Sequence, residues 1–217
     1  GSDGVYVERL IRNARHIEVQ IICDHHGAIS HLWERECTIQ RRNQKLIEVA
    51  PSPSLSDALR TRIIEAAKEM AAAANYDNLG TFEFLVDNDR INDKASDQAF
   101  AFIEANPRLQ VEHTVTEEVL GLDLVQSQLA VAAGATLGSL GLAQAYIPKP
   151  RGYAMQLRVN MEVMDETGGT KPTGGTLDLF DLPSGPGVRV DTFGYSGYRT
   201  STAFDSLLAK VIVHSPD

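Results

Sequence analysis

The stretch FIEANPRLQVEHTVTE, at residues 102–117, constrains the fold most because polar and apolar side chains alternate along it. The polar residues at every second position are Glu104, Asn106, Arg108, Gln110 and Glu112. A period of two places all of them on one face of an extended chain. We therefore predict a strand here, irregular or at a sheet edge near Pro107, which has no N–H to donate to a neighbouring strand.

Two interpretations of this polar face are open from the residues alone. A solvated outer face of an ordinary strand shows the same alternation. Carboxylates, amides and a guanidinium on one stripe also suit a site that holds both a cation and an anion. The neighbouring GTFEF segment carries Glu83, and pairing with the strand of Glu104 would bring two carboxylates and Asn106 together as Mg²⁺ ligands. A cross-strand pair of solvated acids is the alternative.

The remaining pattern predicts an antiparallel α+β fold. Predicted strands cover 16–23, 28–39, 45–51, 80–87, 98–113 and 153–163, with a last strand inside 203–215. Helices are predicted over 54–76, from Thr116 onward and over 124–133, and the Gly- and Pro-rich run 168–197 predicts hairpins. The polar loop NDRINDKASD, at 88–97, would join the two strands that carry Glu83 and Glu104.

The predicted helix at 54–76 has a start signal and an apolar face. Ser54 or Ser56 can cap it. Leu59, Ile63 and Ala67 recur at helical spacing and should face the core.

Composition excludes several classes of function. The formal charge of −9 argues against a nucleic-acid or anionic-membrane surface, and no apolar run is long enough to span a bilayer. The cysteines Cys23 and Cys37 make no disulfide framework and no zinc motif, so we interpret them as small buried hydrophobic residues. We expect a cytosolic location, with a mitochondrial one as the alternative.

Arg108 and Arg158 each lie within a predicted strand, beside apolar neighbours. A guanidinium there can hold a carboxylate-like anion with its planar fork. A surface arginine whose stem covers apolar area is the alternative for either one.

Longer motifs supply a resemblance to a family. The segments RHIEVQIICD, ERECTIQRRNQKLIEVAPS, GTFEFL, FIEANPRLQVEHTVTEEVLGLDLV, PSGPGVRVD and FDSLLAKVIV resemble, in this order, the biotin carboxylases of biotin-dependent carboxylases, which belong to the ATP-grasp superfamily. The resemblance runs from about Val5 to the last residue. It implies an ATP-grasp-type antiparallel sheet with helices over 1–145, followed by a biotin carboxylase C-terminal domain over 146–217.

The resemblance also implies roles for individual residues. Glu83 and Glu104 resemble the family's Mg²⁺ (or Mn²⁺) ligands, assisted by Asn106. The groups that resemble the bicarbonate-holding set are Lys45, Arg108, Gln110 and the Val111 backbone. Glu112 resembles the general base that deprotonates bicarbonate. It lies four residues after Arg108, whose charge should keep it ionised, and Arg158 resembles the arginine that stabilises the biotin enolate.

The nucleotide contacts are implied in the same way. Glu8, Arg9 and Ile11 resemble the segment that receives adenine. His16 and Gln40 resemble groups near the ribose, and Gln44 lies in the same loop as Lys45.

The implied reaction is the ATP- and bicarbonate-dependent carboxylation of biotin through carboxyphosphate. Biotin would arrive on a separate carrier domain, and a carboxyltransferase would use the product; the resemblance also suggests a homodimer. The family's glycine-rich phosphate loop has no counterpart among these residues, so we expect the 217-residue chain to be a fragment that is inactive by itself.

Three departures from the family pattern are Asn43, where His is usual, and Gln156 and Met161, where Glu and Ala are common. Two rival interpretations stand beside the resemblance. The chain could belong to another ATP-grasp ligase, such as a relative of carbamoyl-phosphate synthase, or it could be a non-catalytic dimerisation or binding module.

Overall fold

The computed structural model describes residues 4–90 and 99–216. Most of the predicted loop at 88–97 therefore lies outside the described residues. The strands are β1 Ala14–Cys23, β2 Ile29–Arg41, β3 Gln44–Ala50, β4 Asn78–Asp87, β5 Phe100–Asn106, β6 Tyr153–Asn160, β7 Glu162–Met164, β8 Thr170–Pro172, β9 Val188–Thr192 and β10 Leu207–Ser215. The helices are α1 Asp57–Ala73, α2 His113–Leu120, α3 Leu124–Ala132 and a 3₁₀ turn at Gln144–Tyr146.

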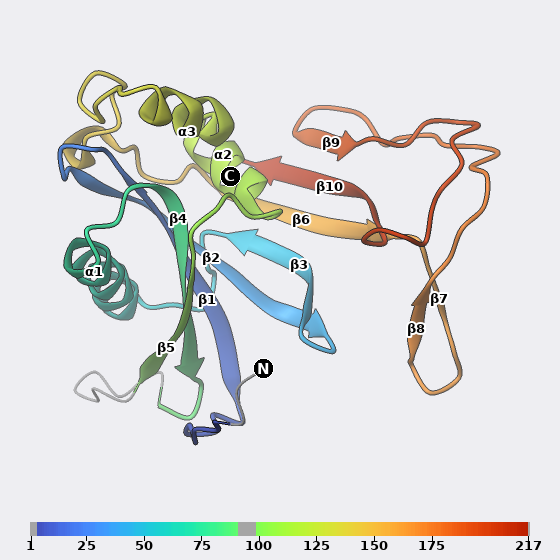
Figure 1. Cartoon of the computed structure of the whole chain (residues 1–217), viewed down its shortest axis with the longest axis horizontal. Helices are drawn as coiled ribbons and strands as arrows, with labels where there is room; N and C mark the ends of the chain where they lie inside the picture. Colours follow the sequence, from blue (N-terminus) through green and yellow to red (C-terminus); the bar gives the residue numbers. More distant parts are fainter. Residues whose placement is uncertain (1–3, 91–98, 217) are drawn as a thin grey trace.

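Within the described part of the chain, one eight-stranded sheet organises the molecule, in the order β5-β4-β1-β2-β3-β6-β10-β9. Its strand pairs are all antiparallel, and β7 with β8 forms a separate hairpin that extends away from the sheet (Figure 1). The predicted antiparallel α+β class is confirmed. The sheet continues across the predicted boundary at 145/146 through the pairing of β3 with β6, and the division into two domains stays a prediction.

The first core lies between α1 and the sheet. β1 contributes Ile17, Val19 and Ile21 to this cluster, and β4 contributes Phe82 and Phe84. Burial of aliphatic and aromatic side chains of this size stabilises the fold by about 1.5–3 kcal/mol each.

Helix α1 forms as the sequence predicts. Ser56 caps it by accepting a hydrogen bond from the backbone N–H of Leu59 at 3.3 Å. Its predicted inner face is buried at Leu59, Ile63 and Ala67. The apolar side of β1 and β4 is thus covered along the length of the helix.

A second core packs α2 and α3 against the other part of the sheet. Its members include Val115 and Val119 of α2, Leu124 of α3, and Ala154 and Ile212 of the strands β6 and β10. This packing holds the first turn of α2 next to β6, and two of the functional residues described below lie here: Glu112 directly before α2, and Arg158 on β6.

The prediction of one strand over 98–113 is wrong. β5 ends at Asn106, directly before Pro107, because proline cannot donate a ladder hydrogen bond. The chain turns there, with the N–H of Arg108 donating to the carbonyl of Asn106 at 2.8 Å, and α2 begins at His113. Glu104 and Asn106 therefore lie on a strand, whereas the later polar residues lie on a connecting segment and at a helix start.

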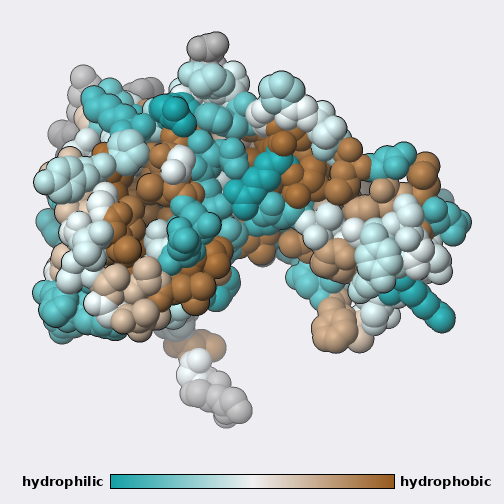
Figure 2. Space-filling view, turned by 90° about the horizontal axis from the view of Figure 1, so that it is seen from above, coloured by the Kyte–Doolittle hydropathy of each residue, from teal (hydrophilic) through white to brown (hydrophobic). Residues whose placement is uncertain are grey.

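From above, the molecule is indented between a larger part and a smaller one, and hydrophobic and hydrophilic side chains alternate over this face (Figure 2). No helix among the described residues combines the length and apolar character that crossing a membrane requires.

Candidate active site

An open cavity of about 750 Å³ lies beside the polar face of the sheet. It gathers most of the residues that the sequence singled out. Those that line it are His16, Gln40, Gln44, Lys45, Glu83, Glu104, Asn106, Arg108, Gln110, Val111, Glu112 and Arg158. They come from six strands and from the segment that leads into α2, so only the folded sheet brings them together.

Glu83 of β4 is a centre of this site. Its two carboxylate oxygens lie 2.5 Å from His16 Nε2, 2.7 Å from Gln110 Nε2, 2.9 Å from Asn106 Nδ2 and 3.1 Å from Lys45 Nζ. Burial alone would raise the pKa of Glu83, but the hydrogen bond from His16 and the charge of Lys45 lower it to about 2. Glu83 is therefore an anion throughout the neutral range.

The predicted pairing of the two acidic strands is confirmed, since Glu83 is the register partner of Glu104. Asn106 Nδ2 also lies 3.1 Å from Glu104 Oε1. Gln110 is buried, and its Oε1 has no hydrogen-bond partner among the described residues. Two carboxylates and the unpaired amide oxygen of Gln110 form a donor set of the kind that Mg²⁺ prefers, so these residues fit such an ion.

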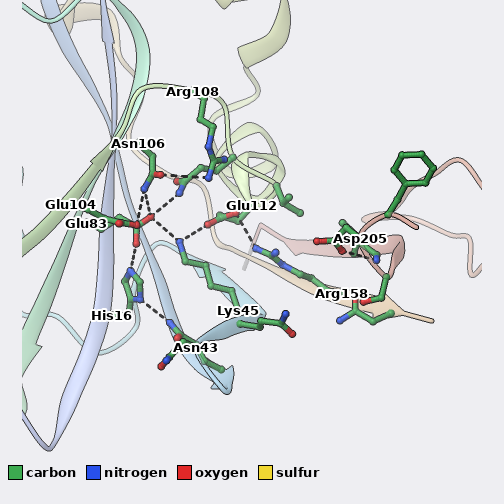
Figure 3. A pocket seen from close by; sticks show the side chains of 18 of the residues that line it. His16, Asn43, Lys45, Glu83, Glu104, Asn106, Arg108, Glu112, Arg158 and Asp205 are labelled. Atoms are coloured by element: carbon green, nitrogen blue, oxygen red, sulfur yellow. Dashed lines mark hydrogen bonds and ion pairs between the residues drawn. The ribbon is translucent and has the colours of Figure 1, made fainter. Parts of the chain in front are cut away.

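Lys45 of β3 connects three carboxylates, of which Figure 3 shows Glu83 and Glu112. Its Nζ lies 2.6 Å from Glu18 Oε2, 2.6 Å from Glu112 Oε1 and 3.1 Å from Glu83 Oε1. Burial would lower the pKa of Lys45, but the negative charges around it, with Glu18 foremost, raise it above its ordinary value. Lys45 is thus held as a cation inside the site.

Glu112, at the start of α2, is bound by two cations. Beside its contact with Lys45, its Oε2 lies 3.1 Å from a terminal nitrogen of Arg158. Arg158 Nε in turn lies 2.6 Å from Glu48 Oε1. Burial opposes the charge of Arg158, but Glu48 and Glu112 raise its pKa.

The cation expected beside Glu112 was Arg108, and this expectation is wrong. Arg108 is exposed at the rim of the cavity, and its hydrogen bonds run to its own segment, at 3.4 Å to Leu109 O and 3.5 Å to Asn106 Oδ1. The extended spacing that would have placed the two side chains on one strand face ends at Pro107. The cations that contact Glu112 are instead Lys45 and Arg158.

The remaining predicted residues divide into two groups. His16 Nδ1 lies 2.7 Å from Gln40 Nε2, so these two form one cluster, and Gln44 lines the cavity from the start of β3. The carbonyl of Val111 accepts a hydrogen bond from Lys210 at 2.9 Å. The residues predicted to receive adenine do not line this cavity and lie in the segment before β1; they are Glu8, Arg9 and Ile11.

Sequence reasoning missed the buried partners of these residues. Glu18 of β1 is fully buried and lies 2.5 Å from Arg35 Nε, which is fully buried as well. Glu48 has no exposed surface either. The only signal for Glu18 and Glu48 was a charged residue between apolar neighbours in a strand, which is equally typical of a solvated face, and Arg35 lies between two other charged residues. Asp205 is part of the FDSLLAKVIV motif, but the motif alone gave it no role. In the structure it lies opposite Arg158 in the cavity (Figure 3).

The buried charges that contact one another do not balance. The acids are Glu18, Glu48, Glu83 and Glu112, and the bases are Arg35, Lys45 and Arg158. Apart from His16, which also contacts Glu83, the acids exceed the bases by one, and Glu104 lies beside them. A bound divalent cation would offset this excess.

Comparison with protein families identifies the chain. Residues 1–140 match the model described as "Carbamoyl-phosphate synthase L chain, ATP binding domain", and residues 156–217 match "Biotin carboxylase C-terminal domain". The chain belongs to the biotin carboxylase family. The predicted resemblance is therefore confirmed.

Individual relatives agree with this membership. A biotin carboxylase of Nostoc is 44% identical over 217 residues, which cover 100% of this chain and 45% of that protein. A pyruvate carboxylase of Aspergillus niger is 44% identical over 211 residues, covering 97% of this chain and 17% of that protein. The chain thus spans less than half the length of the curated biotin carboxylase relatives that it matches.

Solved structures of biotin carboxylase domains have the same fold. The domain of a single-chain bacterial carboxylase aligns with a TM-score of 0.84 at 53% identity, covering 98% of this chain and 46% of that one. The biotin carboxylase domain of the Hydrogenobacter thermophilus 2-oxoglutarate carboxylase, in complex with MgADP, ADP and bicarbonate, aligns with a TM-score of 0.85 at 39% identity. That alignment covers 96% of this chain and 43% of that one.

Proposed function

We propose that this chain is the part of a biotin carboxylase that holds bicarbonate, the metal ion and the biotin ring during ATP-dependent carboxylation of biotin. One observation carries the proposal: Glu112 lies between Lys45 and Arg158, and the Glu83 cluster adjoins the same Lys45. A base, two cations and a set of oxygen ligands thus face one cavity. The bound nucleotide and bicarbonate of the 2-oxoglutarate carboxylase domain support the same assignment.

Glu83 and Glu104, with Asn106, would hold Mg²⁺ or Mn²⁺. The metal ion supplies charge neutralisation, which lets anionic bicarbonate approach anionic phosphate. His16, Gln40 and Gln44 border the same cavity and would contact the ribose side of ATP. Adenine contacts from Glu8, Arg9 and Ile11 stay a prediction.

Lys45, Arg108, Gln110 and the Val111 backbone would bind bicarbonate beside Glu112. Bicarbonate is a weak nucleophile until it loses its proton, and Glu112 is the carboxylate placed to accept it. To accept the proton, Glu112 must exchange one of its two cationic partners for the substrate hydroxyl. The deprotonated bicarbonate would attack the γ-phosphorus of ATP and displace ADP, and the carboxyphosphate so formed would break to CO₂ and phosphate.

Arg158 would act in the second half of the reaction. Its guanidinium reaches the cavity from β6, and its positive charge suits the oxygen of the biotin ring once the phosphate released from carboxyphosphate has taken the ureido proton of that ring. Biotin would be delivered on a carrier domain, and a carboxyltransferase would use the carboxybiotin. The multidomain carboxylases among the relatives support these partners and a dimer.

The experiment that tests the function uses a full-length protein that carries this segment. We expect ATP hydrolysis to require bicarbonate, and free biotin to be carboxylated. ATP hydrolysis that responds to ammonia and not to biotin would instead assign the carbamoyl-phosphate synthase type of reaction. A stable protein that binds but does not turn over ATP would assign the non-catalytic role.

The 217-residue chain alone should show no bicarbonate-dependent ATP hydrolysis. The reason is the expected lack of a glycine-rich loop whose backbone amides would hold the phosphates. Turnover by the purified chain at a rate comparable to that of the full-length protein would contradict this.

A further inference from the structure

A closed ring of side chains joins Arg158 to Glu112 through three residues outside the cavity lining. Arg158 Nε donates to Glu48 Oε1 at 2.6 Å, and its terminal nitrogen donates to Glu112 Oε2 at 3.1 Å. Glu48 Oε2 accepts from Gln156 Nε2 at 2.9 Å, and Gln156 Oε1 accepts from the Thr114 hydroxyl. Thr114 lies in the first turn of α2, two residues after Glu112, so the helix backbone closes the ring.

The far side of this ring is sealed from solvent. Glu48, Gln156 and Thr114 are all 0% exposed, whereas the Arg158 side chain is 18% exposed and reaches the cavity. None of the three lines the cavity, so Glu48 does not meet the substrates. A carboxylate buried this completely is stable only while its partners stay in place.

We propose that Glu48 is a positioning residue, which fixes the guanidinium of Arg158 in the orientation that meets the biotin ring. The inference rests on the proposed function. Glu48 takes the Nε edge of the guanidinium and leaves the terminal nitrogens directed at the cavity. Gln156 holds Glu48 in turn, because its Nε2 amide donates a hydrogen bond to Glu48 Oε2. A glutamate, which is common at this position in the family, has no such N–H donor.

The chemistry explains why two carboxylates share Arg158. Glu112 loses its negative charge when it accepts the proton of bicarbonate, so its attraction for Arg158 weakens during the first half-reaction. Glu48 takes no part in that transfer, and its hydrogen bonds from Arg158 and Gln156 do not depend on it. Arg158 therefore stays oriented when the biotin enolate forms, after carboxyphosphate has broken down.

Because Glu48 serves only the second half-reaction, its replacement should affect biotin carboxylation more than bicarbonate-dependent ATP hydrolysis. Loss of its charge should lower biotin carboxylation by about 10²-fold, the cost of a misplaced group near the chemistry, because Arg158 becomes free to turn. Bicarbonate-dependent ATP hydrolysis should change by less than about threefold, a small change on that scale. A merely structural role would lower both activities together.

The test compares Glu48→Gln with matched variants in the full-length protein. Gln156→Leu removes one donor to Glu48 but leaves the pair with Arg158, so it should shift the ratio of the two activities in the same direction and less far. It also serves as the test if Glu48→Gln does not fold. Glu34→Gln is the control, because Glu34 is equally buried, pairs with Arg60 at 2.8 Å and lies outside the cavity lining. It should leave the ratio unchanged.

A double variant decides whether Glu48 acts through Arg158. With Arg158→Gln already present, Glu48→Gln should change the ratio by less than about twofold, since the residue to be positioned is gone. An equal loss of both activities in Glu48→Gln, or an unchanged shift in the double variant, would overturn the positioning role. If Arg158→Gln itself leaves the ratio unaltered, the proposed function of Arg158 fails and the inference falls with it. A shift in Arg158→Gln without one in Glu48→Gln overturns the inference alone.

Discussion

The two faces of strand β1 are both buried, but their chemistry is opposite. Ile17, Val19 and Ile21 pack against the α1 side, where shape and volume are enough. Glu18 and Gln20 face the other way and are also 0% exposed, with Arg35 bound to both. Burial alone does not distinguish the faces.

The difference lies in what each face demands of its neighbours. Apolar side chains tolerate substitutes of similar volume, since dispersion contacts are not directional. Buried charges require particular partners at hydrogen-bond distance, because an unpaired charge gives up its hydration free energy and gains no interaction that replaces it. The polar face is therefore pre-ordered around Lys45, and that order is what a catalytic site needs.

Replacement of Glu112 should cause the largest change on the polar face. Glu112→Gln keeps the shape but removes the proton acceptor, so we expect kcat in the full-length protein to fall by about 10² to 10⁴-fold. ATP affinity should change little, because the groups placed around the nucleotide are other residues. Glu117→Gln is the control, since Glu117 is buried on the same helix but pairs with Arg189 outside the cavity lining. A fall in kcat of less than about tenfold for Glu112→Gln would contradict the base role.

The stability of the two faces can be compared directly on β1 and its neighbour. Arg35→Met removes the guanidinium that donates to Glu18 and Gln20 and leaves Glu18 with Lys45 as its one cationic partner, so we expect the free energy of unfolding to fall by about 3–5 kcal/mol. Ile17→Val, on the apolar face, should cost only about 0.5–1.5 kcal/mol. Urea denaturation followed by the fluorescence of Trp33, the single tryptophan of the chain, measures both. Equal costs would remove the distinction between the faces.

A titratable residue on the apolar side should make the stability of the fold depend on pH between about 4 and 6.5. Burial lowers the pKa of His31 to about 4, and the positive charge of Lys68 lowers it further in the same direction. The Nδ1 atom of His31 accepts a hydrogen bond from the backbone N–H of Trp33 at 3.2 Å. Because the folded state disfavours the protonated ring, its contribution is complete above pH 6.5 and is lost as the pH falls toward 4. We expect a loss of about 1–3 kcal/mol over that interval.

The variant His31→Gln should remove this part of the pH dependence of unfolding, while exposed His26→Gln should not. The measurement is urea denaturation at several pH values between 4 and 7. A wild-type dependence that survives His31→Gln unchanged would show that other groups cause it.

Local signals in the sequence were sufficient for much of the fold. The Ser56 cap and the Leu59, Ile63, Ala67 face follow from helical spacing, and the predicted pairing of Glu83 with Glu104 is confirmed. The prediction that the strand continues to residue 113 was wrong. Polar and apolar residues still alternate after Pro107, but this alternation does not show that the backbone has turned away from the sheet.

The site was predictable only in part, for a physical reason. Its lining residues could be matched to family motifs, but the buried partners Glu18, Arg35 and Glu48 could not be told from solvated strand residues. Their roles depend on the register between strands that are distant in sequence, such as β3 beside β6. Register is set by tertiary packing, which a single sequence does not display.

The split between the two half-reactions in Arg158→Gln tests the central claim most directly. The claim is that Glu112 and Lys45 serve bicarbonate, while Arg158 serves biotin. In the full-length protein, the variant should lose carboxylation of free biotin by about 10² to 10³-fold, as expected for one missing charge-stabilising group. It should keep most of its bicarbonate-dependent ATP hydrolysis. Equal loss of both activities would contradict the division of roles, and unchanged biotin carboxylation would contradict the function assigned to Arg158.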